Sequence, residues 1–246
     1  MAPEQYHYHE FTENCKEILL RSDITRAVSP GAGRPTREQA ERRHALLLDR
    51  ALDLFLDRGY EQTTLEAIAA SVRMTKRTVY GLYEDKAALF RAAVQHAIEQ
   101  WVVPKETLRS LETGDLEGTL LAVARTRVAH VMTPEGIKLQ RIINAESYRF
   151  PEIFTAAYEQ ATMPLIEFLE DVLRRHRAKG AVSIARPKMA AAVFLTMVVG
   201  GPARILATGN RLDARDLEER IVFGVRLFLN GIRSRESNGS ARRTVA

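Results

Sequence analysis

Residues 63–90 read TTLEAIAASVRMTKRTVYGLYEDKAALF, and this stretch decides the fold. It contains two short segments with helical spacing of apolar residues, expected at about 64–71 and 75–81. Residues that can cap a helix precede both segments, in the capping box Thr63-x-x-Glu66 and at Thr75. Helices of about two turns are marginal alone, so tertiary packing must hold them. The stretch therefore predicts a tight helix-to-helix turn that packs on a longer preceding helix.

The preceding helix is expected at about 37–58. It begins at a second capping box, Thr36-x-x-Gln39, and stops at Gly59. Apolar side chains of all three helices can then meet in one small core. The side chains expected in this core are Leu48, Ala51, Leu52, Phe55, Ile68, Ala69, Val79 and Leu82.

The outward face of the second short helix carries hydroxyls, a phenol and two cations, with no acid among them. An α-helix fits the major groove of DNA, where such donors read base edges while neighbouring groups hold phosphates. We expect Lys76 and Arg77 to contact bases, and Tyr80 and Lys86 to hold phosphates. Residues 34–37 form an arm that can follow the backbone or enter the minor groove. The alternative is a small helical subdomain whose cations are merely solvated.

The ordered motifs between residues 37 and 100 are ALDLF (51–55), GYEQTT (59–64), IAA (68–70), TKRTVY (75–80), Tyr83 and KAALF (86–90). Together they resemble the TetR/AcrR family of transcriptional regulators. The resemblance implies a dimeric repressor that binds a palindromic operator and leaves it when a small molecule binds the C-terminal domain. It also places the helix-turn-helix at about Thr64–Tyr83. Some members activate, or bind DNA only with ligand, and the sequence leaves these alternatives open.

One position departs from the family pattern. Members usually have glycine in the turn between the two short helices, and Arg73 stands there in this chain. If this residue must take a positive φ, arginine costs about 1 kcal/mol more than glycine, and its side chain can add a phosphate contact. The residues expected to bind DNA are Arg34, Arg37, Thr64, Arg73, Thr75, Lys76, Arg77, Thr78, Tyr80, Tyr83 and Lys86.

Helical spacing continues beyond the three-helix unit, and strand-like alternation is absent from the sequence. Further helices are expected at about 85–110, 115–132, 134–148, 151–179, 187–207 and 214–233. Pro164 should kink the helix that contains it. The predicted fold is all-α with about nine helices. Its parts are a flexible arm at 1–35, a DNA-binding domain at 36–90, an effector-binding and dimerisation domain at 91–233 and a disordered tail at 234–246.

The C-terminal helices can enclose a cavity for an unidentified small-molecule effector, although plain core packing explains the same apolar residues. Residues 140–153 loosely resemble the C-terminal domain of AefR-like members of the family. The candidate pocket residues are Trp101, Val128, Gln140, Ile143, Asn144, Tyr158 and Leu165.

The last two helices are the candidates for a homodimer interface. Their apolar residues recur at helical spacing, and Gly200-Gly201 allows close approach of backbones. The alternative is that both helices complete the core of the monomer. The candidate interface residues are Phe194, Val198, Leu217, Ile221, Val225 and Phe228.

The composition is that of an ordinary globular protein: 246 residues, 46% hydrophobic, a formal net charge of +5 and one cysteine. A single cysteine excludes an internal disulfide, and no apolar run is long enough to predict a membrane span. We therefore expect a cytoplasmic, nucleoid-associated protein. No nucleophile elbow, P-loop, dinucleotide fingerprint or zinc spacing is present, so neither enzymatic activity nor a cofactor is expected. A metal site formed by His7, His9 and Cys15 is the weaker alternative.

Overall fold

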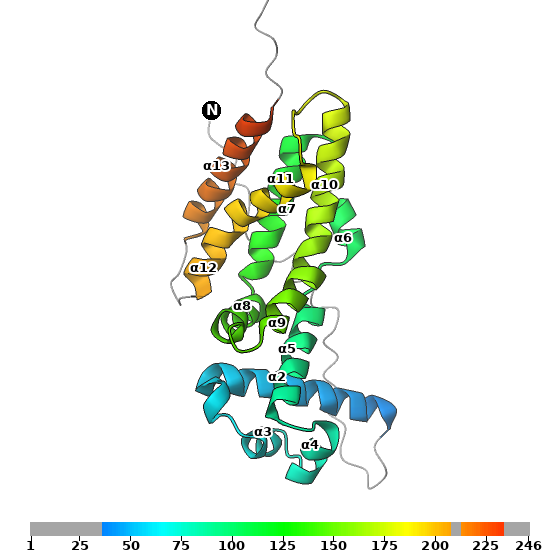
Figure 1. The fold of residues 1–246 in the computed structure, drawn as a ribbon, viewed down its shortest axis with the longest axis vertical. Coiled ribbons are helices and arrows are strands. Elements are labelled where there is room, and N and C mark those ends of the chain that lie inside the picture. The colour runs from blue at the N-terminus through cyan, green and yellow to red at the C-terminus, as the bar shows by residue number, and fades with distance from the viewer. Residues whose placement is uncertain (1–35, 208–212, 234–246) are drawn as a thin grey trace, which may run out of the picture. The chain divides into compact units, whose positions relative to one another are not determined.

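The computed structural model describes residues 36–207 and 213–233, so the predicted arm at 1–35 and tail at 234–246 lie outside it. The described part of the chain is helical, and one isolated antiparallel bridge joins Val182 to Arg233. The all-α prediction is confirmed (Figure 1). In chain order, the elements are α2 (Arg37–Gln62), α3 (Leu65–Ser71), α4 (Lys76–Leu82), α5 (Lys86–Gln100), α6 (Lys105–Ser110), α7 (Leu116–Val131), α8 (Pro134–Glu146), α9 (Pro151–Ala157), the π-helical turn η2 (Tyr158–Thr162), α10 (Met163–Ala178), α11 (Pro187–Leu195), the π-helical turn η3 (Thr196–Gly200), α12 (Gly201–Ala207) and α13 (Ala214–Ile232).

Helices α2, α3 and α4 form the expected small core. Leu48, Ala51, Leu52, Phe55, Ile68, Ala69 and Val79 are all buried. Leu82 was expected with them, but half of its surface is exposed. The chain leaves α4 at this point, and it is the following residue, Tyr83, that turns back to stack on His44 of α2.

Side-chain caps begin most of the helices, as the sequence indicates. In the unit formed by the residues up to Glu41, Thr36 and Gln39 make the reciprocal capping box, with hydrogen bonds of 3.0 and 3.2 Å. The box predicted at Thr63 is wrong by one residue, because Thr64 caps α3 by accepting from the Ala67 amide. The Thr63 hydroxyl is buried and donates to backbone carbonyls of α2 instead.

Three of the long predicted helices are interrupted. The one expected at 85–110 is divided into α5 and α6, since Pro104 cannot continue α5. The one expected at 151–179 widens into the π-helical turn η2 just before Pro164. Pro164 therefore falls in the first turn of α10, where no amide donor is required. The third, at 187–207, contains the π-helical turn η3.

Aromatic rings connect the three-helix unit to the C-terminal helices. Phe90 of α5 meets Phe55 of α2 at a ring-centroid distance of 5.0 Å and Phe150, the N-cap of α9, at 4.7 Å. Tyr60 also contacts Phe150, at 5.0 Å. Helix α5 further packs on α8 and α9 (Figure 1). The DNA-binding candidates are thus continuous with the C-terminal domain through one core.

Candidate nucleic-acid interface

Helix α4 presents the predicted polar face to solvent. Its N-cap Thr75 accepts a hydrogen bond from the Thr78 amide, and the two hydroxyl oxygens lie 2.8 Å apart. Val79 is completely buried and fixes the rotation of the helix. The side chains that remain exposed around it are Thr75, Lys76, Arg77, Thr78 and Tyr80. The structure therefore brings the predicted base-reading residues together on one short helix.

An acid that sequence reasoning missed lies beside this face. Glu66 of α3 forms an ion pair with Lys76, whose ammonium also lies 5.3 Å from the centre of the Tyr80 ring. The hydrogen bond between the two groups lowers the pKa of Glu66 and raises the pKa of Lys76. Arg77 has no ion-pair partner among the described residues. Exposed pairs are weak, so a DNA phosphate can compete with Glu66 for Lys76.

Arg73 adopts the conformation that the turn requires. It has φ +54°, and it is the only non-glycine residue with a positive φ within the described chain. The backbone of the turn is closed by hydrogen bonds from Arg73 N to Ala70 O and from Met74 N to Ala69 O. Arg73 is exposed to solvent. Its predicted contact with phosphate stays a prediction.

Two of the predicted DNA contacts are already engaged inside the protein. The Lys86 ammonium donates to the carbonyls of Tyr60 (2.8 Å) and Glu61 (3.1 Å) and lies 4.4 Å from the centre of the Tyr60 ring. The Tyr83 hydroxyl lies 2.7 Å from His44 Nε2, and burial raises the pKa of this phenol. Tyr83 ties the end of α4 to α2, and Lys86 ties the start of α5 to α2, which makes both positioning groups in the free protein.

The remaining predicted contacts are peripheral. Thr64 is exposed and caps α3. Arg37 is exposed and pairs with Glu41 at 2.8 Å. Arg34 lies outside the described residues.

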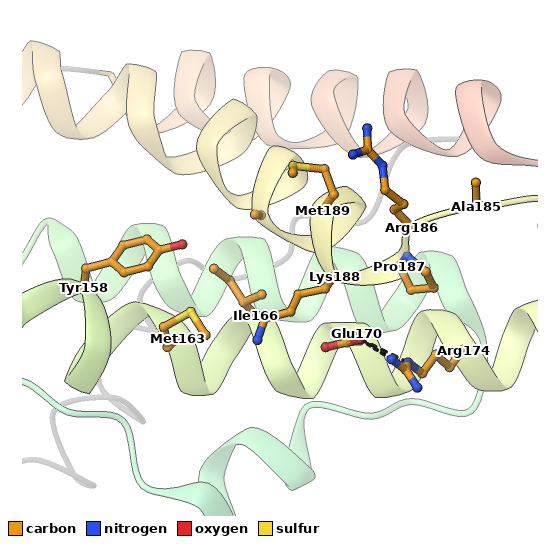
Figure 2. Close-up of a pocket in the computed structure, with 11 residues that line it drawn as sticks. Tyr158, Met163, Ile166, Glu170, Arg174, Ala185, Arg186, Pro187, Lys188 and Met189 are labelled. Carbon is orange, nitrogen blue, oxygen red and sulfur yellow. Dashed lines mark hydrogen bonds and ion pairs between the residues drawn. The ribbon is translucent and has the colours of Figure 1, made fainter. Parts of the chain in front are cut away.

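The predicted pocket residues do not line one cavity. Trp101, Val128, Ile143 and Leu165 are buried in the core, whereas Gln140 and Asn144 reach only each other near the surface. An open groove of about 590 Å³ lies between α10 and α11 instead, and Tyr158 is the one predicted residue on it (Figure 2). Its lining consists of Tyr158, Met163, Ile166, Glu170, Arg174, Ala185, Arg186, Pro187, Lys188, Met189 and Ala192.

The six predicted interface residues are all buried in the core of the single chain. This corrects the prediction, because side chains hidden within one protomer cannot meet a second. The large apolar side chains exposed on these helices are Met189, Val193 and Met197 of α11–η3, and Phe223 and Leu227 of α13. They recur every four residues, so they form a second apolar stripe beside the buried one. Gly224 permits the close approach of α13 to Val198, since an added Cβ would lie 3.1 Å from that side chain.

Two further expectations concern metals and membranes. Among residues 36–207 and 213–233 no group of three or more His, Cys, Asp or Glu residues is placed to hold a metal ion. His7, His9 and Cys15 lie outside them. The segment Pro187–Ile205 is long and apolar enough to pass for a membrane span by length and composition. Its apolar character has a different explanation here, since one face is packed on α10 and the other carries the exposed stripe.

Comparison with known proteins agrees with this architecture. Residues 47–93 match the family model of bacterial regulatory proteins of the tetR family, and residues 118–231 match that of the C-terminal domain of AefR-like transcriptional repressors. The HTH-type transcriptional regulator YvkB of Bacillus subtilis is 24% identical over 190 residues, which are 76% of this chain and 95% of YvkB.

Solved structures agree as well. A TetR-family transcriptional regulator of Mesorhizobium loti superposes with a TM-score of 0.66 at 26% identity, over 81% of this chain and 100% of the other. The flavonoid-responsive regulator FrrA does so with a TM-score of 0.62 at 27% identity, over 80% and 100%. Fold and site together define a helix-turn-helix transcriptional regulator. The chain belongs to the TetR family, with an AefR-like C-terminal domain.

Proposed function

We propose that this protein is a cytoplasmic, nucleoid-associated repressor that binds a palindromic DNA operator as a homodimer and is released by a small-molecule effector. The observation that carries the proposal is the exposed face of α4, which offers hydroxyls and cations around the single buried anchor Val79. Such a face supplies hydrogen-bond donors to base edges, with Arg77 as the side chain free to make a bidentate contact. The match to a model of transcriptional repressors favours repression over activation.

The exposed stripe on α11–η3 and α13 supports dimerisation. Met189, Val193 and Met197, with Phe223 and Leu227, form more exposed apolar surface than scattered side chains would. Packing against the same stripe of a second copy gives a two-fold interface of four helices. Two-fold symmetry then sets the two copies of α4 in successive major grooves, about 34 Å apart.

Release by an effector requires that the C-terminal domain influence α4. Helix α5 is the candidate connection, because Lys86 at its start holds the end of α2 while Phe90 contacts Phe150. Ion pairs add to this junction, between Lys138 and Asp53 at 2.7 Å and between Arg149 and Glu61. An effector that favours one position of α5 would change the spacing of the two recognition helices.

Selection of bound duplexes from a random pool tests the proposal. We expect a palindromic motif whose half-sites are centred about one helical turn apart. The doubly substituted Arg77→Ala, Thr78→Ala protein is the control. Both side chains are exposed, so the fold should be kept. Because the side chains proposed to contact bases are removed, this variant should enrich no motif. The proposal fails if the wild-type protein enriches the same sequences as this control.

A further inference from the structure

Arg127 of α7 is a buried cation with no carboxylate partner among the residues that the structure describes. It is 7% exposed, and its Nη1 atom is the only buried side-chain nitrogen or oxygen within the described chain that lacks a hydrogen bond. No carboxylate among these residues forms an ion pair with it. Burial lowers the pKa of Arg127 to about 10, so the guanidinium stays charged at neutral pH. Buried charges in proteins are normally paired, because burial of an unpaired charge is costly. A bound anion would therefore stabilise Arg127.

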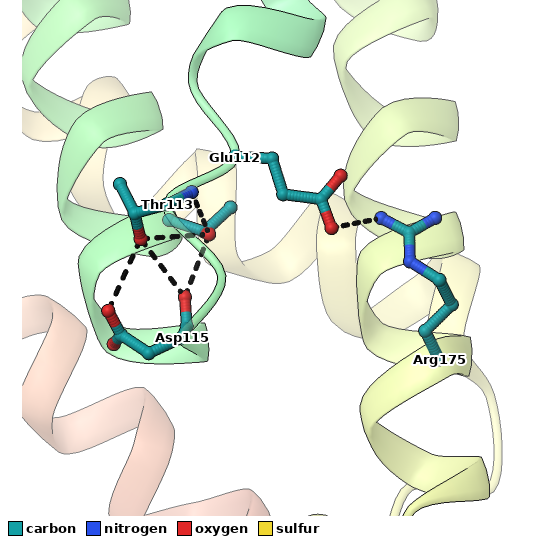
Figure 3. A network of polar contacts seen from close by, with 5 residues as sticks. Glu112, Thr113, Asp115 and Arg175 are labelled. Carbon is teal, nitrogen blue, oxygen red and sulfur yellow. Dashed lines mark hydrogen bonds and ion pairs between the residues drawn. The ribbon is translucent and has the colours of Figure 1, made fainter.

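A second arginine on the same helix shows what the ordinary arrangement is. Arg125 is partly exposed and its Nε lies 3.1 and 3.2 Å from the two carboxylate oxygens of Glu218 on α13. This pairing ties α7 to α13 and leaves no charge uncompensated. At its N-terminal end, α7 is held by the cap Asp115, which also contacts Thr113 in the preceding loop (Figure 3). The helix is therefore anchored without Arg127.

Two ring side chains, Trp101 and His130, lie beside the Arg127 guanidinium. Its Cζ lies 4.0 Å from the centre of the Trp101 ring, which holds the group by a cation–π contact. His130 meets the same indole at a ring-centroid distance of 5.0 Å. Burial, followed by the charge of Arg127, lowers the pKa of His130 to about 4, so this imidazole is neutral at pH 7. Of these three side chains, only Arg127 is charged at pH 7.

Buried apolar side chains flank Arg127 along α7. Val123 and Val131, one turn to either side on α7, are buried in two different parts of the core. Val131 and Trp101 belong to the part shared with the three-helix unit, and Val123 belongs to the part built by the C-terminal helices. A ligand here would contact both parts. A single buried cation in apolar surroundings suits a planar monoanion, because a phosphate dianion would need further cations or donors.

We propose that Arg127 is the anion-binding residue of the effector site, and that the effector is a small organic carboxylate with an apolar body. The guanidinium can form two parallel hydrogen bonds to a carboxylate, and its contact with the Trp101 ring holds it in place. Trp101 is also the C-cap of α5, the helix whose first residue is Lys86. A carboxylate on Arg127 would therefore act at the end of the helix that reaches the DNA-binding unit, a step that rests on the proposed function.

Thermal unfolding at pH 7 with matched acids and amides tests the site. The probes are benzoate, hexanoate and 1-naphthoate, each compared with its uncharged amide. We expect at least one acid, and not its amide, to raise the Tm of the wild-type protein, by about 5–10 °C at 100 times its Kd. Arg127→Met should lose this shift, and Arg125→Met should keep it. The inference is overturned if no acid exceeds its amide, or if Arg127→Met responds like the wild type.

Unfolding without ligand provides a second, independent readout. Because Arg127→Met replaces an uncompensated buried cation by an apolar chain of similar length, its urea midpoint should equal or exceed that of the wild type. Arg125→Met should lower the midpoint, since it leaves Glu218 unpaired. A large drop in the Arg127→Met midpoint would show that the guanidinium only supports the fold, and would overturn the inference.

Binding to the selected operator separates this inference from the proposed function. An acid that raises the Tm should release DNA from the wild type and from Arg125→Met, and not from Arg127→Met. If the wild type binds no duplex specifically while the acid-dependent Tm shift persists, the repressor proposal fails and the anion site stands. If it binds DNA specifically and no acid acts on it, the anion site alone fails.

Discussion

The helix-turn-helix and the C-terminal domain distribute charge in opposite ways. Around α4 the cations Lys76 and Arg77 are exposed and Val79 is buried. In the C-terminal domain Phe223 and Leu227 are exposed, while Arg127 is buried and no carboxylate of the described residues pairs with it. Each arrangement indicates the kind of binding partner that suits it. Exposed cations suit phosphates and bases, an exposed apolar stripe suits a second apolar surface, and an unpaired buried cation suits an anion.

The largest expected effect of a substitution is on the oligomeric state, at the apolar surface that the C-terminal domain exposes. Phe223→Asp combined with Leu227→Asp should abolish the proposed dimer, since each change puts a charge where about 2–4 kcal/mol of interface energy is expected. Sedimentation equilibrium measures the mass. Tyr148→Asp, at a fully exposed aromatic outside the stripe, is the matched control and should leave the dimer intact. A doubly substituted protein that still sediments as a dimer would contradict the assignment of this stripe.

The buried charge of the C-terminal domain should make stability depend on pH. The pKa of His130 is about 4 in the folded protein and near 6.5 in the unfolded chain, because burial and Arg127 disfavour its cation. Above pH 6.5 both states hold a neutral imidazole. Below it the unfolded chain takes up a proton that the folded protein does not. The free energy of unfolding should therefore fall by about 3 kcal/mol between pH 6.5 and pH 4.

Urea titrations across this range measure the loss, and His130→Gln should remove the part that is due to this residue. The same slope in the wild type and in His130→Gln would show that His130 is free to protonate in the folded protein.

Within the DNA-binding unit, Lys86 and Lys76 should contribute differently to stability. Lys86→Met removes two hydrogen bonds to the carbonyls that end α2, so the free energy of unfolding should fall by about 1–2 kcal/mol. Lys76→Met breaks only an exposed ion pair and should change stability by less than about 0.5 kcal/mol. Urea unfolding checks both. Unchanged stability of Lys86→Met, together with a salt slope of DNA binding lowered by about one charge, would restore Lys86 as a phosphate contact.

Arg73 provides the smallest expected effect. Arg73→Gly relieves the positive φ and should raise the free energy of unfolding by about 1 kcal/mol. Arg77→Gly, inside α4, should instead lower it by about 1 kcal/mol. Thermal unfolding of the two variants gives the signs directly. If Arg73→Gly is no more stable than the wild type, the side chain itself contributes to the turn.

The sequence predicted α4 better than the last helices for a physical reason. One face of α4 is polar, so the apolar side chain Val79 identifies the buried face without ambiguity. Helix α13 has apolar residues on two faces, and periodicity alone does not say which one packs inside the protomer. The buried choice, Val225 rather than Phe223, depends on contacts with α7 that are distant in sequence.

Local features show the same division. The positions of helix caps and of proline-started helices could be predicted from the sequence, because they depend on neighbouring residues. The cap of α3 was predicted one residue too early, at Thr63 instead of Thr64. The ion pair between Glu66 and Lys76 joins two helices and has no local signature. The burial of Arg127 away from any carboxylate of the described residues is likewise a property of the packed core. In the sequence it is one arginine among many.

Specific binding of DNA by α4 is the central claim, and fluorescence anisotropy tests it most directly. The wild type and Arg77→Ala are titrated against the selected operator and a scrambled duplex at two salt concentrations. We expect salt-sensitive, saturable binding of one wild-type dimer per palindrome. We also expect Arg77→Ala to lose about 1–3 kcal/mol on the operator and little on the scrambled duplex. Equal affinity of the wild type for both duplexes, or no effect of Arg77→Ala on their ratio, would contradict the claim.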